Sequence, residues 1–151
     1  MDANHIRIRT EFPIHSNKRA QQGIKLGNRK QRIAISPMLA GIKHLNRLEQ
    51  VLLRDELDER KEDDLVVTNY KDYVVEATCA NLFYWQHGQL HTPDLTLSGV
   101  NGIIRQEILR KYPETQICQT TLADLNVANG MLICNSLMGI MTVKKYNDRK
   151  L

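Results

Sequence analysis

Residues 64–93 constrain the fold more tightly than any other part of this sequence. The segment DLVVTNYKDYVVEATCANLFYWQHGQLHTP contains short runs rich in β-branched and aromatic residues, namely DLVVTN, VVEA and ANLFYW. Runs of this length and composition are typical of strands. His87-Gly88 then predicts a tight turn, and QLHTP is the return strand of a hairpin. A chain with this centre must build a sheet in which neighbouring strands follow one another closely.

Helical patterns lie on both sides of this centre. Apolar residues recur at helical spacing from His44 onward and predict an amphipathic helix that ends in an acid-rich turn. Gly99 and Gly102 precede a second helix, which Pro113 stops. A third, short helix follows a cap at Thr120 or Thr121 and ends at Asn129-Gly130. The face expected to be buried on the first helix consists of Leu45, Leu48, Val51, Leu52 and Leu57.

Further strands are expected before and after these elements. Residues 5–12 alternate apolar and basic side chains, and residues 23–36 form an extended stretch with a bend at Gly27-Asn28. Strands are also expected within residues 114–122, at 131–136 and, as the last element, at 138–147. The mixture of helices and hairpins predicts an α/β or α+β domain with a mixed sheet rather than a pure βαβ array.

The composition indicates one soluble domain over residues 1–151. Apolar residues make up 42% and charged residues 25% of the 151 positions, which suits a single core. We expect no membrane contact, because no apolar run could span a bilayer and the polar N-terminus lacks a signal peptide. The three cysteines form no CxxC pair, so we expect reduced, mostly buried thiols and a cytoplasmic location.

The net charge of +4 is unevenly distributed. Basic residues gather within residues 1–32 and acidic residues within 55–64. The basic segment is open to two interpretations, a nucleic-acid contact or a solvated strand pair that meets another domain. Few aromatic residues accompany it, so we expect no nucleic-acid partner. We also expect no metal site, because His87 and His91 flank a hairpin turn and lack helical ligand geometry.

Three features could carry chemistry, and each also has a purely structural explanation. Lys43 sits behind a small-residue turn among apolar neighbours, where a lysine can simply extend to solvent or can act as a nucleophilic amine. Glu76 is either an outward-facing strand residue or a buried acid paired with a cation. The segment SGVNGIIR places glycines before a helix, whose N-terminal N–H groups suit an anionic group such as phosphate.

Together these features resemble a known family. The blocks LAGIKHLNRLEQVLLR, VVEATCANLFYW, SGVNGIIRQEIL and MLICNSLMGIMTV occur in the order and at the spacings of the aminodeoxychorismate lyases. Those lyases belong to the fold-type IV pyridoxal-phosphate enzymes, together with branched-chain and D-amino-acid aminotransferases. The resemblance covers roughly residues 6–143 and points to the C-terminal domain of these enzymes, a mixed sheet curved into a pseudo-barrel with flanking helices.

The resemblance implies a reaction and a cofactor. Lys43 would hold pyridoxal 5'-phosphate covalently and later move protons. Glu76 would keep the pyridine nitrogen protonated, which makes the ring an electron sink. Arg47 would lie near the ring hydroxyl or the substrate. The implied reaction converts 4-amino-4-deoxychorismate to 4-aminobenzoate and pyruvate, a step of folate synthesis.

The resemblance also implies a phosphate site. The backbone N–H groups of Ile103 and Ile104 would bind the cofactor phosphate at the helix N-terminus. Asn135 and Ser136, at the end of MLICNS, would add further contacts.

The chain is shorter than the family pattern, and this leaves alternatives open. The family's N-terminal domain has no counterpart here, and the C-terminal end is also short. We therefore expect a homodimer or a complementing N-terminal domain to complete the site. The alternatives to the lyase are a class IV aminotransferase and a catalytically silent domain or interaction module.

Overall fold

The computed structural model describes residues 22–46, 48–58 and 60–151. One mixed sheet runs through most of it, with the strand order β3-β2-β1-β8-β7-β4-β5-β6, and β9 pairs with β8 beyond this path. The strands are β1 (Ile24–Ile33), β2 (Asp64–Asn69), β3 (Val74–Ala77), β4 (Asn81–Gln86), β5 (Gln89–Pro93), β6 (Gln116–Cys118), β7 (Gly130–Asn135), β8 (Gly139–Tyr146) and β9 (Arg149–Lys150). The helices are α2 (Leu48–Asp58), α3 (Ile103–Lys111) and α4 (Leu122–Val127).

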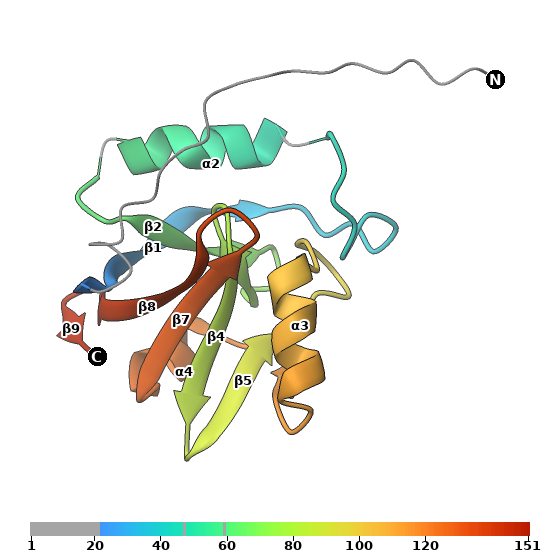
Figure 1. Cartoon of the computed structure of the whole chain (residues 1–151). Helices are drawn as coiled ribbons and strands as arrows, with labels where there is room; N and C mark the ends of the chain where they lie inside the picture. The colour runs from blue at the N-terminus through green and yellow to red at the C-terminus, as the bar shows by residue number, and fades with distance from the viewer. Residues whose placement is uncertain (1–21, 47, 59) are drawn as a thin grey trace.

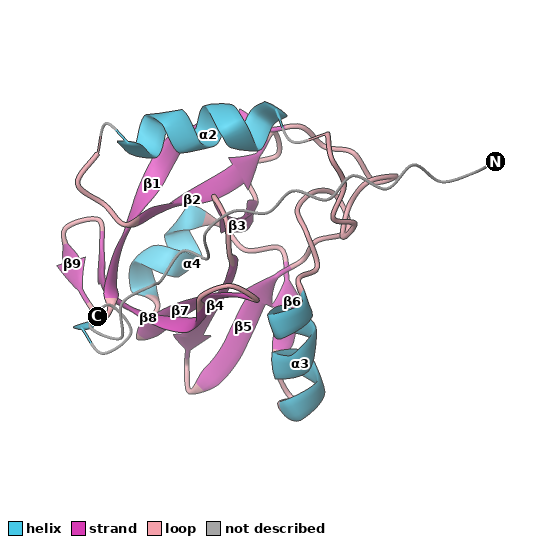
Figure 2. Cartoon of the chain, turned by 45° about the horizontal axis from the view of Figure 1, so that its top comes forward, coloured by secondary structure: helices cyan, strands magenta, loops and turns pink. Residues whose placement is uncertain are grey.

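The sheet is curled into a half-barrel, as Figure 2 shows. Strand β1 pairs in parallel with both β2 and β8, whereas β4 pairs antiparallel with β5 and β7. The two ends of the strand order approach each other, because Val74 on β3 donates its N–H to the carbonyl of Thr120, just beyond β6, at 2.7 Å. The predicted mixed sheet and pseudo-barrel are therefore confirmed.

The central strands are buried on both faces because helices cover them inside and outside. Successive side chains of a strand point to opposite faces. On β2, Val66 joins the largest core cluster with Leu125 and Ala128 of α4 and its flank, inside the curve of the sheet. Val67 faces the other way and packs with Leu53 of α2. The uninterrupted apolar strands of the sequence are explained by this double burial.

Helices α2 and α3 lie on the outer surface at separate places (Figure 1). Helix α3 covers a cluster that contains Phe83, Leu132 and Cys134. Helix α2 is joined to β1 by the ion pair between Arg29 Nε and Glu56 Oε2 at 3.0 Å. None of the described helices is long and apolar enough to cross a membrane.

Most of the predicted elements are confirmed, and the clearest correction concerns α2. This helix begins at Leu48 in the described residues, not at His44, and its apolar face is not the predicted one. Of the predicted face only Leu57 is buried, together with Leu53, which was not predicted. Leu45, Leu48, Val51 and Leu52 are more than half exposed. The spacing of leucines allowed two faces, and contact with β1 and β3 selected the one that contains Leu53.

Four smaller predictions have different outcomes. The extended stretch at 23–36 is strand β1, and its pairing with β2 is irregular just beyond the predicted bend, between Asn28 and Arg32. Strand β8 is not the last element, because the short strand β9 follows it. The cysteines are free as expected, but only Cys134 is buried. The strand predicted at residues 5–12 lies outside the described residues.

Candidate functional site

A cavity of about 220 Å³ gathers most of the candidate residues. It lies between the loop that carries Lys43, the ends of β3 and β4, the start of α3, and the turn after β7. Five of the residues singled out in the sequence line it, from four separate parts of the chain: Lys43, Glu76, Ile103, Asn135 and Ser136. The sheet and its loops therefore bring together side chains that are up to 93 positions apart in the sequence.

Two predicted site residues are not placed in this cavity. Arg47 lies outside the described residues. Ile104 is not among the residues that line the cavity, and its side chain packs against the cluster beneath α3. Its expected contact to phosphate involves only its backbone N–H at the start of α3, and it stays a prediction.

Lys43 is exposed and lies in a loop, five positions before α2. The loop is fixed upstream of the lysine, where Gly41 forms a parallel bridge with Val100. Gly41 donates its N–H to the Gly99 carbonyl at 2.9 Å and accepts the N–H of Asn101 at 3.0 Å. The glycine adopts a φ of 78°, which other residues adopt only with strain. The lysine is thereby held beside the cavity by its backbone.

Glu76 is buried, so it is not the outward-facing strand residue of the first interpretation. Only 5% of it is exposed, although β3 is an edge strand of the sheet. Its Oε2 accepts the N–H of Val100 at 3.1 Å. The turn at Gly99, with φ of 90°, presents this N–H, and a Cβ at Gly99 would lie 2.5 Å from Val75 Cγ1. Only glycine fits this turn without displacing β3.

A buried cation accompanies Glu76. Arg105 on α3 is 4% exposed and donates from its guanidinium to Asn101 Oδ1 at 2.8 Å and to the Pro93 carbonyl at 3.0 Å. Burial lowers the pKa of Arg105, while the negative charges of Asp94, Cys134 and Glu76 act in the opposite direction.

The start of α3 forms an open end of the cavity, where the helix N-terminus has no side-chain cap. Gly102 is the N-cap residue in an extended conformation, and no side chain caps the helix there. The N–H groups of the first turn have no acceptor within the helix, and the helix dipole makes this end positive. Ile103, which lines the cavity, is 68% exposed.

Asn135 and Ser136 occupy the opposite rim, and the structure gives Asn135 a specific task. Asn135 Nδ2 donates to the Cys79 carbonyl at 2.9 Å, and its Oδ1 accepts the N–H groups of Leu137 at 2.9 Å and Met138 at 2.8 Å. The side chain thus fixes the turn after β7. Ser136 is exposed at this rim.

Cys79 also lines the cavity, but its thiol is a poor nucleophile. Although Cys79 as a whole residue is exposed, desolvation of its sulfur by the surrounding protein and the neighbouring Asp64 carboxylate raise the pKa of Cys79 to about 12. The sulfur lies 3.4 Å from Asp64 Oδ2. Because the thiolate is the reactive form, Cys79 stays unreactive near neutral pH.

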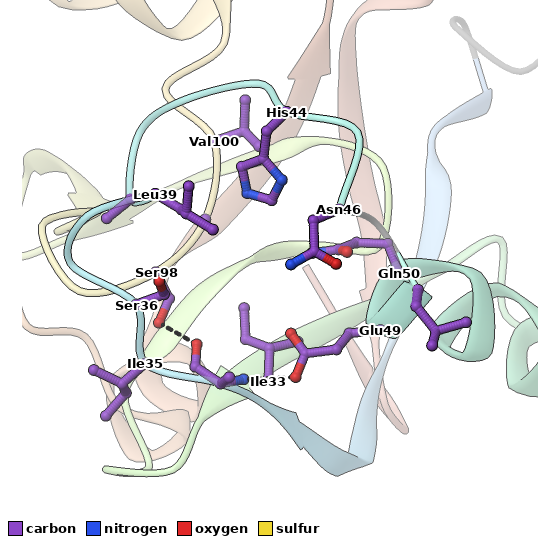
Figure 3. A pocket seen from close by; sticks show the side chains of 14 residues that line it. Ile33, Ile35, Ser36, Leu39, His44, Asn46, Glu49, Gln50, Ser98 and Val100 are labelled. Carbon is purple, nitrogen blue, oxygen red and sulfur yellow. Dashed lines mark hydrogen bonds between the residues drawn. The ribbon is translucent and has the colours of Figure 1, made fainter.

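A second cavity, of about 490 Å³, lies behind the lysine loop (Figure 3). It is bordered by the end of β1, by His44, Asn46 and the first turn of α2, and by Ser98, whose hydroxyl donates to the Ala34 carbonyl at 2.9 Å. Of the predicted site residues within the described part of the chain, none lines this second cavity. The chemistry therefore points to the smaller cavity.

Three polar or turn residues of the smaller cavity were missed in the sequence as site residues: Asn81, Asn101 and Gly102. Asn81 stands five positions after Glu76 in VVEATCANLFYW, one of the blocks that carry the resemblance. Nothing in the local sequence shows that its side chain turns toward α3, because that contact joins β4 to a segment about twenty positions further along.

Comparison with known proteins identifies the family. The model of the family described as amino-transferase class IV matches residues 3–146. The chain belongs to the class IV aminotransferases. An aminodeoxychorismate lyase from Vibrio harveyi is 40% identical over 136 residues, which cover 87% of this chain and 50% of that protein. The chain thus spans about half the length of this lyase.

Solved structures agree with this assignment. The 4-amino-4-deoxychorismate lyase from Pseudomonas aeruginosa superposes with a TM-score of 0.87 and 34% identity, over 93% of this chain and 54% of that one. An aminotransferase from Brucella abortus bound to the cofactor PLP shares the fold with a TM-score of 0.75 and 19% identity, over 86% of this chain and 49% of that one. The expected fold-type IV architecture of this class IV member is confirmed.

Proposed function

We propose that this chain is the cofactor-binding part of a pyridoxal-phosphate lyase that converts 4-amino-4-deoxychorismate to 4-aminobenzoate and pyruvate. The observation that carries the proposal is the cavity that places Lys43, the buried Glu76 and the open N-terminus of α3 together. The 40% identity to an aminodeoxychorismate lyase supports the choice of substrate. A cytoplasmic location, suggested by the free cysteines, belongs to this proposal.

The residues present fit pyridoxal phosphate at both of its polar ends. The first-turn N–H groups of α3, with Ser136 opposite, would hold the phosphate. Glu76, fixed by the Val100 N–H, would hold a proton at the pyridine nitrogen. When bound, the cofactor supplies an electron sink for the carbon that bears the substrate nitrogen.

Lys43 has two tasks in this proposal. Its Nζ would hold the cofactor at the carbonyl carbon, with loss of water, and, once displaced by the substrate amine, would take the proton from the substrate carbon that bears nitrogen. The enolpyruvyl group leaves by cleavage of its ether C–O bond and becomes pyruvate after gaining a proton. The remaining ring becomes aromatic, as 4-aminobenzoate, so the atoms balance without an added reactant.

The proposal includes a partner that completes the site, either a second copy of this chain or an N-terminal domain of the family type. The chain spans about half of its relatives. Large apolar side chains are exposed on the lysine loop and α2: Met38, Ile42, Leu45, Leu48, Val51 and Leu52. Several large exposed apolar side chains on adjoining segments are typical of a contact area. Sedimentation of the purified chain over a range of concentrations would distinguish a dimer from a monomer.

Two alternatives remain part of the test. A class IV aminotransferase is supported by the shared fold of solved aminotransferases. A catalytically silent domain is compatible with a chain of half the family length.

The deciding experiment is cofactor trapping followed by a product assay. The chain and Lys43→Ala are incubated with pyridoxal phosphate and treated with borohydride, and the adduct is mapped by mass spectrometry. We expect an adduct on Lys43 in the parent chain and none in the variant. Pyruvate release from 4-amino-4-deoxychorismate then supports the lyase, and amino transfer to a keto acid supports the aminotransferase. A folded chain that forms no adduct would contradict both enzymatic proposals.

A further inference from the structure

Asn81 lies between Glu76 and the N-terminus of α3, the two polar ends of the cavity. It is the first residue of β4, it lines the cavity and only 6% of it is exposed. Its Oδ1 accepts the N–H of Gly102, the N-cap of α3, at 3.1 Å. Its Nδ2 donates to the Val100 carbonyl at 2.7 Å and lies 3.5 Å from Glu76 Oε2. The Asn81 carboxamide therefore contacts the Glu76 carboxylate, the Val100 carbonyl and the Gly102 N–H at the start of α3.

The peptide groups on either side of Val100 are held in a closed set of hydrogen bonds. Glu76 accepts the N–H of Val100 at 3.1 Å, and Asn81 donates to its carbonyl. The next residue, Asn101, donates its N–H to Gly41 at 3.0 Å and so reaches the lysine loop. Any shift of Asn81 would be passed to Glu76, to the start of α3 and to the segment before Lys43.

The chemistry at this position requires an amide. The Gly102 N–H donates to the Val100 carbonyl at 3.0 Å, and Asn81 adds a second acceptor for this N–H and a second donor for this carbonyl. A carboxamide supplies both in a single orientation. Space is equally restricted, because a Cβ on Gly102 would lie 2.5 Å from Asn81 Oδ1. Aspartate, although nearly the same shape, would place a carboxylate oxygen against the Val100 carbonyl and the Glu76 carboxylate.

We propose that Asn81 is a positioning residue that sets the spacing between Glu76 and the N-terminus of α3, and thereby between the pyridine and phosphate ends of the cofactor site. This inference rests on the proposed function for the identity of the ligand. The geometric part, that Asn81 holds Val100 and Gly102 in place, applies to the free chain as well.

The first test needs no cofactor. Amide hydrogen exchange is measured on the parent chain, Asn81→Ala, Asn81→Asp and the matched control Asn129→Asp, whose side chain is exposed far from the cavity. We expect Asn81→Ala to speed exchange at least tenfold at Val100, and by a smaller factor at Gly102, whose N–H keeps the Val100 carbonyl as an acceptor at 3.0 Å. Asn81→Asp keeps the acceptor for Gly102, so it should speed exchange mainly at Val100. Rates at both amides that equal those of the parent and of Asn129→Asp would overturn the proposal.

The second test uses two probes that separate the ends of the site, pyridoxal phosphate and pyridoxal, which lacks the phosphate. We expect Asn81→Asp to weaken binding of both probes by a similar factor, at least tenfold, because it perturbs the Glu76 end. Asn81→Ala should weaken the binding of pyridoxal phosphate more than the binding of pyridoxal, because this variant also removes the hydrogen bond to Gly102 at the start of α3. Unchanged dissociation constants in both variants would overturn the role in cofactor positioning.

The two tests can fail independently. If the parent chain binds neither probe, the proposed cofactor function fails, and hydrogen exchange still decides whether Asn81 holds the two segments. If the parent binds both probes but the Asn81 variants behave as Asn129→Asp does, the proposed function stands and the role of Asn81 is refuted. Circular dichroism of each variant confirms that it is folded.

Discussion

The two walls of the candidate site differ in how they are held. The wall formed by β3, β4 and the start of α3, which we term the strand wall, contains the buried residues Glu76 and Asn81 joined by hydrogen bonds to Val100 and Gly102. The lysine wall, residues 38–46, contributes the exposed Lys43 to the cavity and continues into α2, and both segments have exposed apolar side chains. The comparison teaches that this fold supplies the cradle by itself, whereas the surface around the lysine has the character of a contact area.

A pair of glycines gives the largest expected contrast between the two walls. Gly99 on the strand wall and Gly41 on the lysine wall both have positive φ and are hydrogen-bonded to each other. A Cβ at Gly99 would lie 2.5 Å from Val75 Cγ1, whereas at Gly41 the nearest atom would be 3.8 Å away. We expect Gly99→Ala to lower the free energy of unfolding by about 3 kcal/mol and Gly41→Ala by about 1 kcal/mol. Urea denaturation measures both, and equal losses would contradict the comparison.

Removing the ionisable side chain of each wall, Glu76 or Lys43, should change stability by different amounts. Glu76→Ala leaves the N–H of Val100 without its buried acceptor, and we expect a loss of about 2 kcal/mol in the free energy of unfolding. Lys43→Ala removes an exposed side chain and should change stability by less than about 0.5 kcal/mol. Thermal and urea unfolding of the cofactor-free chain provide the measurement. A Lys43 effect as large as that of Glu76 would show that the lysine wall is more tightly organised than its exposure indicates.

Buried groups on β7 and β8, outside both walls, should make the protein sensitive to alkali. Burial raises the pKa of Cys134 from 9.0 to about 12, and burial likewise raises the pKa of Tyr146 to about 12. The unfolded chain therefore loses these protons first. Stability should be full below about pH 9 and should fall as pH rises toward 12, by roughly 1.4 kcal/mol per pH unit for each group. In Cys134→Ala, the slope of unfolding free energy against pH should be smaller than in the parent, whatever the loss at neutral pH.

The smallest effect on stability is expected on the outer face of α2. Leu52 is 53% exposed and Leu53, its neighbour, is 3% exposed. We expect Leu52→Ser to change the free energy of unfolding by less than about 0.5 kcal/mol and Leu53→Ala to lower it by about 3 kcal/mol. If α2 covers a partner surface, Leu52→Ser should weaken self-association in sedimentation experiments while the fold persists. A large loss of stability for Leu52→Ser would show that this face is already packed within the chain.

The sequence alone determined the elements whose signals are local. Strands β2 to β5 follow from runs of β-branched and aromatic residues, and the turn at His87-Gly88 follows from its residue types. The start of α3 follows from Gly102, and the cap of α4 at Thr121 is confirmed by its hydrogen bonds with Asp124. The motif blocks also identified the family, and they contain the five predicted site residues that line the cavity. The order and spacing of these blocks are properties of the sequence itself.

The tertiary structure decided what depends on contacts between distant segments. The buried face of α2 could not be derived from leucine spacing, because several faces are apolar and the choice depends on β1 and β3 beneath the helix. The environment of Glu76 was open for the same reason, since an acid in an apolar strand is buried only if another segment, here residues 99–105, covers it. Asn81 acquires its role through hydrogen bonds to Val100 and Gly102, about twenty positions away. Periodicity records which side chains can be buried, but the pairing of distant segments decides which ones are.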